Sequence, residues 1–148
     1  MAAEPVYRIY RPDDEAEIIE VWRRCDLIRP WNHPQEDIRR KFADSPELFF
    51  VCEIDGRPAA SCMAGYDGHR GWIYYLAVAP GLRRRGIATK LVGISEAELA
   101  KLGCPKIDLM VRNTNQAVIE FYKAIGYGDD PVVVLSKRLI EDPPHDFG

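Results

Sequence analysis

The chain has 148 residues, of which 47% are hydrophobic and 29% charged, a composition typical of one globular domain that folds without metals or disulfides. Its formal net charge of −3 argues against a general binder of nucleic acid or of membrane surfaces. No apolar run approaches the roughly 18 residues that cross a bilayer, and the N-terminal residues lack the basic-then-apolar pattern of a secretory signal.

These features lead us to expect a cytoplasmic protein whose partners include neither nucleic acid nor a membrane. The four cysteines lie far apart and form no C-x-x-C pair, so we expect them to be small buried apolar residues rather than a disulfide framework. The three histidines are scattered and show no metal-ligand spacing. We therefore expect no metal.

In chain order, the predicted elements begin with a strand and two helices. Residues 6–11 (VYRIYR) are a short β-rich run that Pro12 ends. A helix follows, capped by Asp13 or Asp14, and its apolar residues recur every three or four positions. The prolines within residues 26–34 predict a loop, and residues 35–42 a second helix.

Three strands and a long helix come next. Residues 48–54 and 59–66 flank the pair Asp55-Gly56, which favours a tight hairpin turn. Residues 72–79 (WIYYLAVA) are apolar on both alternating faces and predict a central strand that is covered on both sides. Residues 86–102 carry an apolar stripe at helical spacing.

The C-terminal part predicts a strand at residues 106–111, a helix at 115–125 and a last strand at 132–139. We expect a single domain over residues 1–140, because adjacent prolines make residues 141–148 a flexible tail. The predicted order is βααβββαβαβ, an α/β (α+β) layered domain with a mixed sheet.

Residues 83–89 (RRRGIAT), between a buried strand and a long helix, carry the strongest chemical signal. The free N–H groups at the start of a helix form a natural anion site. Gly86 lets the backbone approach a ligand closely, and Ala88 keeps the first turn free of bulk. Three arginines add positive charge, so we expect a phosphate or pyrophosphate here.

Two other phosphate motifs do not fit this segment. Gly81 and Gly86 have P-loop spacing, but Ile87-Ala88 stand where that loop requires Lys-Ser/Thr. There is also no G-x-G-x-x-G pattern, which disfavours a nucleotide-binding protein. An isolated R-x-x-G-x-A is a weak motif, and a solvated turn explains it about equally well.

The motif does not stand alone, because a strand follows it and then Asn115, Phe121-Tyr122 and Gly126-Tyr127. From Tyr7 to Leu139, in motif and element order, the chain resembles the GNAT superfamily of acetyl-CoA-dependent N-acetyltransferases. Residues 25–32, 65–71 and 103–107 look closer still to its bacterial YpeA-type branch. The resemblance implies a mostly antiparallel sheet, acetyl-CoA as acyl donor and no metal, and it is compatible with a homodimer.

The resemblance also assigns roles to single residues. Leu76, Ala77 and Val78 would pair with the pantetheine arm, with Leu76 near the thioester. Asn115 would contact the pantetheine or pyrophosphate region, and Tyr122 would stand by the sulfur as general acid, although an aromatic on the inner face of a helix is often only core. The residues that would hold the coenzyme A pyrophosphate are Arg83, Arg84, Arg85, Gly86, Ile87, Ala88 and Thr89.

The general base is unknown at this point. An amine must lose a proton before it attacks the thioester, but the strand from Trp72 to Val78 has no carboxylate, where many family members carry a glutamate. This absence also leaves open an alternative function, a non-catalytic acyl-CoA-binding sensor. The candidate bases are Tyr74 or Tyr75 through water, Glu53, Asp67, His69 and Glu120.

We expect the acceptor to be a primary amine of a small molecule, a protein or a peptide. Loops on a rigid scaffold commonly carry specificity, although core and surface roles fit the same residues at least as well. The candidate acceptor-binding residues are Asp26, Arg29, Trp31 and Asn32 in the first long loop, and Tyr66, Asp67 and His69 in the hairpin turn.

Overall fold

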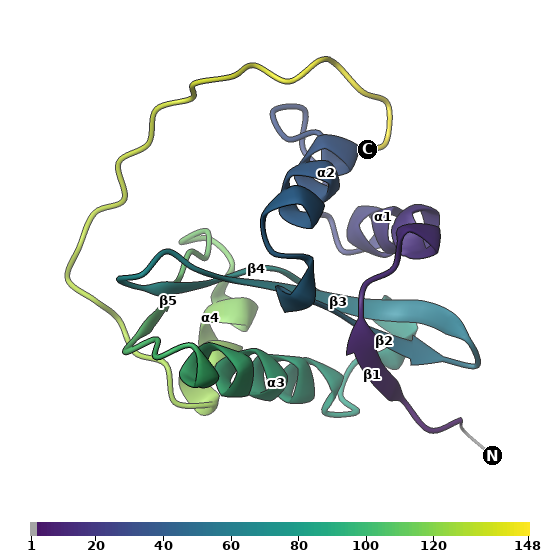
Figure 1. The fold of residues 1–148 in the computed structure, drawn as a ribbon, viewed down its shortest axis with the longest axis horizontal. Coiled ribbons are helices and arrows are strands. Elements are labelled where there is room, and N and C mark those ends of the chain that lie inside the picture. The colour runs from purple at the N-terminus through teal and green to yellow at the C-terminus, as the bar shows by residue number, and fades with distance from the viewer. Residues whose placement is uncertain (1–2) are drawn as a thin grey trace.

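A five-stranded sheet forms the middle layer of the protein (Figure 1). The computed structural model describes residues 3–148. Each neighbouring pair among strands β1 to β4 is antiparallel, and β5 runs parallel to β4 at one edge. This arrangement confirms the expected mixed, mostly antiparallel sheet. The strands β1 to β5 span Val6–Ile9, Phe49–Ile54, Arg57–Tyr66, Gly71–Val78 and Ile107–Leu109.

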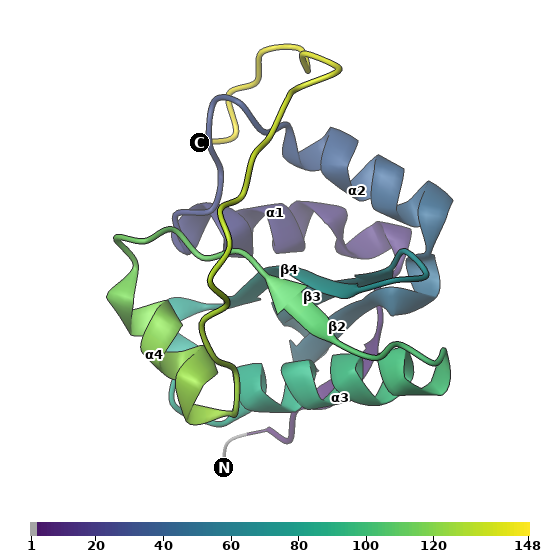
Figure 2. The ribbon, with the colours of Figure 1, turned by 90° about the vertical axis from the view of Figure 1, so that its left-hand side faces the viewer.

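Two pairs of helices cover the two faces of this sheet (Figures 1 and 2). Helices α1 (Glu15–Arg24) and α2 (Pro34–Asp44) lie on one face, and α3 (Ile87–Lys101) and α4 (Gln116–Ala124) on the other. Short 3-10 turns at Pro12–Asp14, Pro46–Leu48 and Pro80–Leu82 connect the elements. No helix of residues 3–148 is long and apolar enough to span a membrane.

The alternation of side chains along the strands divides the interior into two cores. In β2, Phe49 and Val51 pack with α1, whereas Phe50 and Cys52 pack with α3, because successive strand residues point to opposite faces. Trp22 fills the centre of the α1 core and is fully buried. The sheet is therefore covered on both sides, as the apolar sequence of β4 predicted.

Strands β4 and β5 pair over three residues only, from Gly71 with Ile107 to Ile73 with Leu109. From Tyr74 onward, β4 has no register partner on β5. The pairing therefore ends at Ile73 and Leu109, and the following edge of β4 is open. Below, this opening is called the splay.

A β-bulge interrupts β4 beside the splay. Ser61 pairs with Ala77 and Met63 with Tyr74, so the single residue between them on β3 faces two residues of β4, Tyr75 and Leu76. Tyr75 adopts a left-handed φ of 50°. The predicted central strand forms, but its alternation shifts here, because the extra residue turns Tyr75 towards the α1 core and Leu76 towards the α3 core.

The C-terminal segment differs most from the sequence prediction. No strand forms at residues 132–139, and this stretch runs around the outside of the molecule (Figure 1). The side chains of Val133 and Leu135 are 83% and 90% exposed. A Val-rich run favours a strand only where a paired, half-buried surface receives it, and the free edge of β5 is not paired with it.

The tail that we expected to be unpacked contacts the α1–α2 side of the protein. Asp142 forms an ion pair with Arg40 of α2, and Nε2 of His145 lies 2.9 Å from the backbone oxygen of Arg29. Phe147 packs at the margin of the α1 core. The chain end thus becomes part of the surface around the α1–α2 loop.

Gly71 provides a stability test of the β4–β5 contact. A Cβ there would lie 2.7 Å from Sγ of Cys104 and 3.1 Å from Cδ1 of Leu99. Gly71→Ala is therefore expected to lower the free energy of unfolding by about 1–3 kcal/mol, as measured by urea denaturation. The control is Gly93→Ala, where a Cβ meets nothing within 4 Å in α3 and should add about 0.5–1 kcal/mol. Equal unfolding midpoints of the two variants would contradict this assignment.

Candidate functional site

The N-terminus of α3 presents unpaired backbone amides to solvent. The first helical hydrogen bond runs from the amide of Lys90 to the oxygen of Gly86, at 3.0 Å, so the amides of Ile87, Ala88 and Thr89 have no acceptor within the helix. Gly86 has a left-handed φ of 76°, and a Cβ there would meet nothing within 4 Å. The backbone is open to a ligand at this turn.

Three arginines directly precede these amides in the chain. Arg83, Arg84 and Arg85 are exposed, and in the described part of the chain none of them forms an ion pair with a carboxylate. Nη2 of Arg83 lies 3.7 Å from Sγ of Cys25. The positive end of the α3 helix dipole adds to the attraction of these arginines for an anion. Residues 83–89, called the anion cradle below, suit a phosphate or diphosphate.

The anion cradle adjoins the splay because β4 leads directly into the turn before α3. Leu76 and Val78 are half-buried against the α3 core, whereas Ala77 is buried in the α1 core. The edge of β4 that faces β5 carries no register partner at these residues. An extended ligand can pair with such an edge as an added strand would.

Tyr122 of α4 belongs to the same apolar cluster as Leu76. Its side chain is 6% exposed, and its ring packs edge-to-face against Phe121 and Tyr127 at centroid distances of 5.1 and 5.4 Å. Burial raises the pKa of Tyr122 above its ordinary value. The hydroxyl therefore stays protonated at neutral pH and can act as a proton donor. Asn115 caps α4, where its Oδ1 accepts from the amide of Val118 at 3.4 Å.

The loop between α1 and α2 meets the loop that follows β5 at the open end of the splay (Figure 2). The guanidinium of Arg112 lies 5.3 Å from the ring centroid of Trp31. Asp26 and Arg29 form an ion pair at 3.8 Å. Four of the predicted acceptor residues, Asp26, Arg29, Trp31 and Asn32, therefore share one loop that borders the splay.

C-terminal residues form the other wall of this region. Nη2 of Arg138 lies 3.4 Å from Oδ1 of Asn32, and a cavity of about 440 Å³ separates the loop from the chain end. Sequence reasoning missed this wall, since the only signal, a proline pair, indicated an unpacked tail. The cavity is lined by Pro30, Trp31, Arg138, Glu141, Asp142, Pro143 and Pro144.

The hairpin residues Tyr66, Asp67 and His69 lie elsewhere. The hairpin turn lies near the start of β5, because the amide of Gly71 donates to the oxygen of Lys106. Trp31, by contrast, contacts Arg112, which lies beyond the end of β5. The structure does not bring the two predicted groups of acceptor residues together.

Asp67 also does not suit the role of a base. Its Oδ1 accepts from the amides of His69 and Arg70 at 2.8 and 2.7 Å, and its Oδ2 accepts from Nε1 of Trp72. These hydrogen bonds lower the pKa of Asp67 to about 2. Asp67 therefore stabilises the turn.

The other candidate bases differ in their surroundings. Glu53 is held by an ion pair with Arg8 at 3.0 Å, and Glu120 lies exposed on α4. Tyr75 lies at the bulge, and its hydroxyl donates to Oδ2 of Asp37 in α2 at 2.5 Å. Sequence reasoning missed Asp37, because an acidic residue in the first turn of a helix is ordinarily explained by the helix dipole alone.

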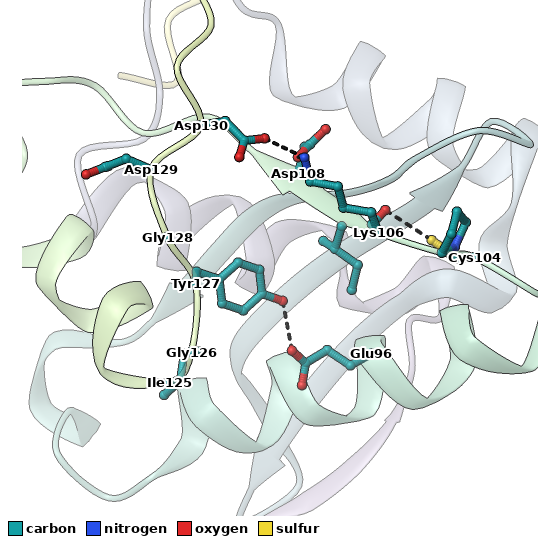
Figure 3. Close-up of a pocket in the computed structure, with 12 residues that line it drawn as sticks. Glu96, Cys104, Lys106, Asp108, Ile125, Gly126, Tyr127, Gly128, Asp129 and Asp130 are labelled. Carbon is teal, nitrogen blue, oxygen red and sulfur yellow. Dashed lines mark hydrogen bonds and ion pairs between the residues drawn. The ribbon is translucent and has the colours of Figure 1, made fainter.

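A second cavity, of about 480 Å³, lies beside β5 and the end of α4 (Figure 3). Lys106 bridges Asp130 and Asp108 at 2.6 and 3.7 Å, and the hydroxyl of Tyr127 donates to Glu96 at 2.9 Å. None of the predicted site residues lines this cavity, so its paired side chains serve to tie β5 and α3 to the segment after α4. In residues 3–148 no group of three potential metal ligands is found.

Comparisons with known proteins agree with this geometry. The model of the acetyltransferase (GNAT) family matches residues 5–127. An acetyltransferase of Sodalis glossinidius is 53% identical over 136 residues, which cover 91% of this chain and 96% of the relative. An acetyltransferase of Pectobacterium atrosepticum is 52% identical over 135 residues, with the same coverage.

Solved structures show the same fold. Ard1 from Thermoplasma volcanium superposes with a TM-score of 0.75 at 23% identity, over 82% of this chain and 81% of that one. A chain of the NatC complex bound to Gag peptide and CoA gives a TM-score of 0.73 at 26% identity, over 83% and 84%. Naa20 of Chaetomium thermophilum, in complex with a bisubstrate analogue, gives a TM-score of 0.68 at 28% identity, over 83% of this chain and 70% of that one. With its anion cradle, its splay and a family match over most of its length, the chain belongs to the GNAT family of acetyl-CoA-dependent acetyltransferases.

Proposed function

We propose that the protein transfers an acetyl group from acetyl-CoA to a primary amine of a small molecule, a protein or a peptide. One observation carries this proposal: the anion cradle, the open edge of β4 and Tyr122 lie around one splay. Along acetyl-CoA, the diphosphate would need the anion cradle, the extended pantetheine arm would need the open edge of β4, and the thioester would need a proton donor such as Tyr122.

The side chains and amides of the chain fit this donor. The amides of the anion cradle and its arginines would hold the diphosphate, and the backbone from Leu76 to Val78 would pair with the pantetheine arm. Acetyl-CoA supplies an activated acyl thioester when it is bound. The backbone amide of Leu76, at the bulge, would donate to the developing oxyanion, and the hydroxyl of Tyr122 would protonate the departing sulfur.

The acceptor would enter from the α1–α2 side, through the cavity between the α1–α2 loop and the C-terminal segment. Two structural relatives above 25% identity were solved with a Gag peptide and CoA or with a bisubstrate analogue, which favours polypeptide amines as the first class to examine. A homodimer, with which the family resemblance is compatible, stays a prediction.

The first test is turnover. With acetyl-CoA and a panel of peptide N-termini, lysine peptides and small amines, we expect release of free thiol that requires both substrates. Mass spectrometry should find the acetyl group on nitrogen of the acceptor. Tight acetyl-CoA binding without turnover on any amine would instead favour a non-catalytic acyl-CoA sensor.

Tyr122→Phe tests the general acid. The ring and its packing are retained while the proton donor is lost, so we expect kcat to fall about 10²-fold or more with the affinity for acetyl-CoA nearly unchanged. Because burial raises the pKa of Tyr122 above its ordinary value, ionisation of this hydroxyl should not limit the wild-type rate near neutral pH. An unchanged kcat in the variant would remove Tyr122 from the chemical step.

Gly86→Glu tests the anion cradle. A carboxylate on the unpaired amides of α3 repels a diphosphate, so we expect the affinity for coenzyme A, measured by calorimetry, to fall at least about tenfold. The matched control is Gly68→Glu in the β3–β4 turn, which has a positive φ of 91° and equally open space. The control shares the backbone strain and should bind coenzyme A normally. Equal affinities of both variants would contradict the cradle assignment.

A further inference from the structure

A buried chain of hydrogen bonds ends at the bulge of β4. Nε1 of Trp22 donates to Oγ of Ser61 at 2.8 Å, and Oγ of Ser61 donates to the backbone oxygen of Tyr75 at 2.8 Å. Ser61 and Trp22 are both 0% exposed. A buried hydroxyl satisfied on both sides in this way is costly to misplace, because neither partner can turn to water.

The side chain of Tyr75 is held at two further points. Its ring stacks on the indole of Trp22, with centroids 3.8 Å apart and planes 14° apart. Its hydroxyl donates to Oδ2 of Asp37 at 2.5 Å. Contacts from α1, α2 and β3 therefore converge on one residue.

Tyr75 needs this support because its backbone is strained. A φ of 50° places a residue with a Cβ in the left-handed region, which costs free energy and persists only where the surroundings determine it. No glycine or asparagine, which adopt this conformation most readily, occupies the position. The contacts of Trp22, Ser61 and Asp37 are the ones that hold Tyr75 there.

The strained residue sets the direction of the next one. Leu76 has no register partner on β3 or on β5, and its side chain lies in the same cluster as Tyr122. If Tyr75 relaxed to ordinary strand geometry, the alternation of β4 would shift by one residue. Leu76 would then leave the cluster that contains Tyr122.

We infer that Trp22, Ser61, Tyr75 and Asp37 are positioning residues for acetyl transfer, which hold the β4 bulge so that the amide of Leu76 faces the thioester carbonyl. This inference rests on the proposed function and names residues that act through the backbone of β4. It also connects the acceptor side of the protein to the reacting centre, because α1 and α2 supply two of the contacts.

The first experiment compares two buried serines. Ser61→Ala removes the support of the Tyr75 carbonyl, and we expect kcat to fall at least about tenfold while KM for acetyl-CoA changes less than about twofold. The control is Ser95→Ala, also 0% exposed, whose hydroxyl donates to Leu91 within α3 and lies 3.4 Å from Sγ of Cys62, but contacts neither Trp22 nor the Tyr75 carbonyl. Ser61→Ala should lose the more thermal stability of the two, because it leaves both Trp22 Nε1 and the Tyr75 carbonyl without a partner, so kcat is compared at a temperature where both variants are folded. Equal kcat values for the two variants would overturn the inference.

Asp37 is tested by two substitutions. Asp37→Asn retains an oxygen that accepts from Tyr75, so kcat should stay within about threefold of wild type and the pH profile should keep its shape. Asp37→Ala removes the acceptor, and kcat should fall with KM for acetyl-CoA unchanged. An asparagine variant as slow as the alanine variant, or one whose acidic limb shifts, would overturn the positioning role, since it would make the charge of Asp37 essential.

A third readout does not depend on turnover and separates this inference from the proposed function. In wild type, the backbone amide NMR signal of Leu76 should differ between the complexes with acetyl-CoA and with coenzyme A, which lacks the acetyl carbonyl. In Ser61→Ala this difference should disappear although both ligands still bind. A difference that persists in the variant would overturn the inference, even if no amine of the panel were acetylated.

Discussion

The left-handed backbone of Tyr75 is the constraint on which the arrangement of the site depends. It inserts one extra residue into β4 and so turns Leu76 towards α3 and α4. Without the bulge, regular alternation would turn Tyr75 towards the cluster that contains Tyr122, and Leu76 away from it. The local strain is offset by packing against Trp22 and by two hydrogen bonds, so the buried α1 core supports the bulge of the sheet.

The charge of the anion cradle is opposite in sign to that of the chain as a whole. The chain is acidic as a whole, but three adjacent arginines and the amide-rich start of α3 make one turn strongly positive. Because the helix dipole and the unpaired amides are properties of the backbone, this attraction survives loss of a single arginine better than a change at Gly86. Selection of an anionic ligand is thus built into the fold, and the side chains modulate it.

Sequence patterns predicted the helices and the first five strands to within a few residues, because apolar periodicity follows the two faces of the sheet. The anion cradle was predicted from glycine and arginines before a helix only together with the motifs that follow it, since a solvated turn explains the isolated motif about equally well. The bulge could not be found, because the alternation of residues 72–79 is apolar throughout and an inserted residue leaves no mark on it. Asp37 escaped notice because its partner, Tyr75, lies 38 positions away, and the strand at residues 132–139 was overpredicted from valine content.

The C-terminal segment is attached near each end by ion pairs, Asp130 with Lys106 and Asp142 with Arg40, while the valines between them remain exposed. Ion pairs therefore hold both ends of this stretch, whose C-terminal part lines the cavity beside Trp31. The Debye length falls from about 10 Å at 0.1 M salt to about 3 Å at 1 M, and the partly exposed pairs weaken with it. The cavity beside the α1–α2 loop, through which we propose that the acceptor enters, is consequently bounded more loosely in concentrated salt than in dilute buffer.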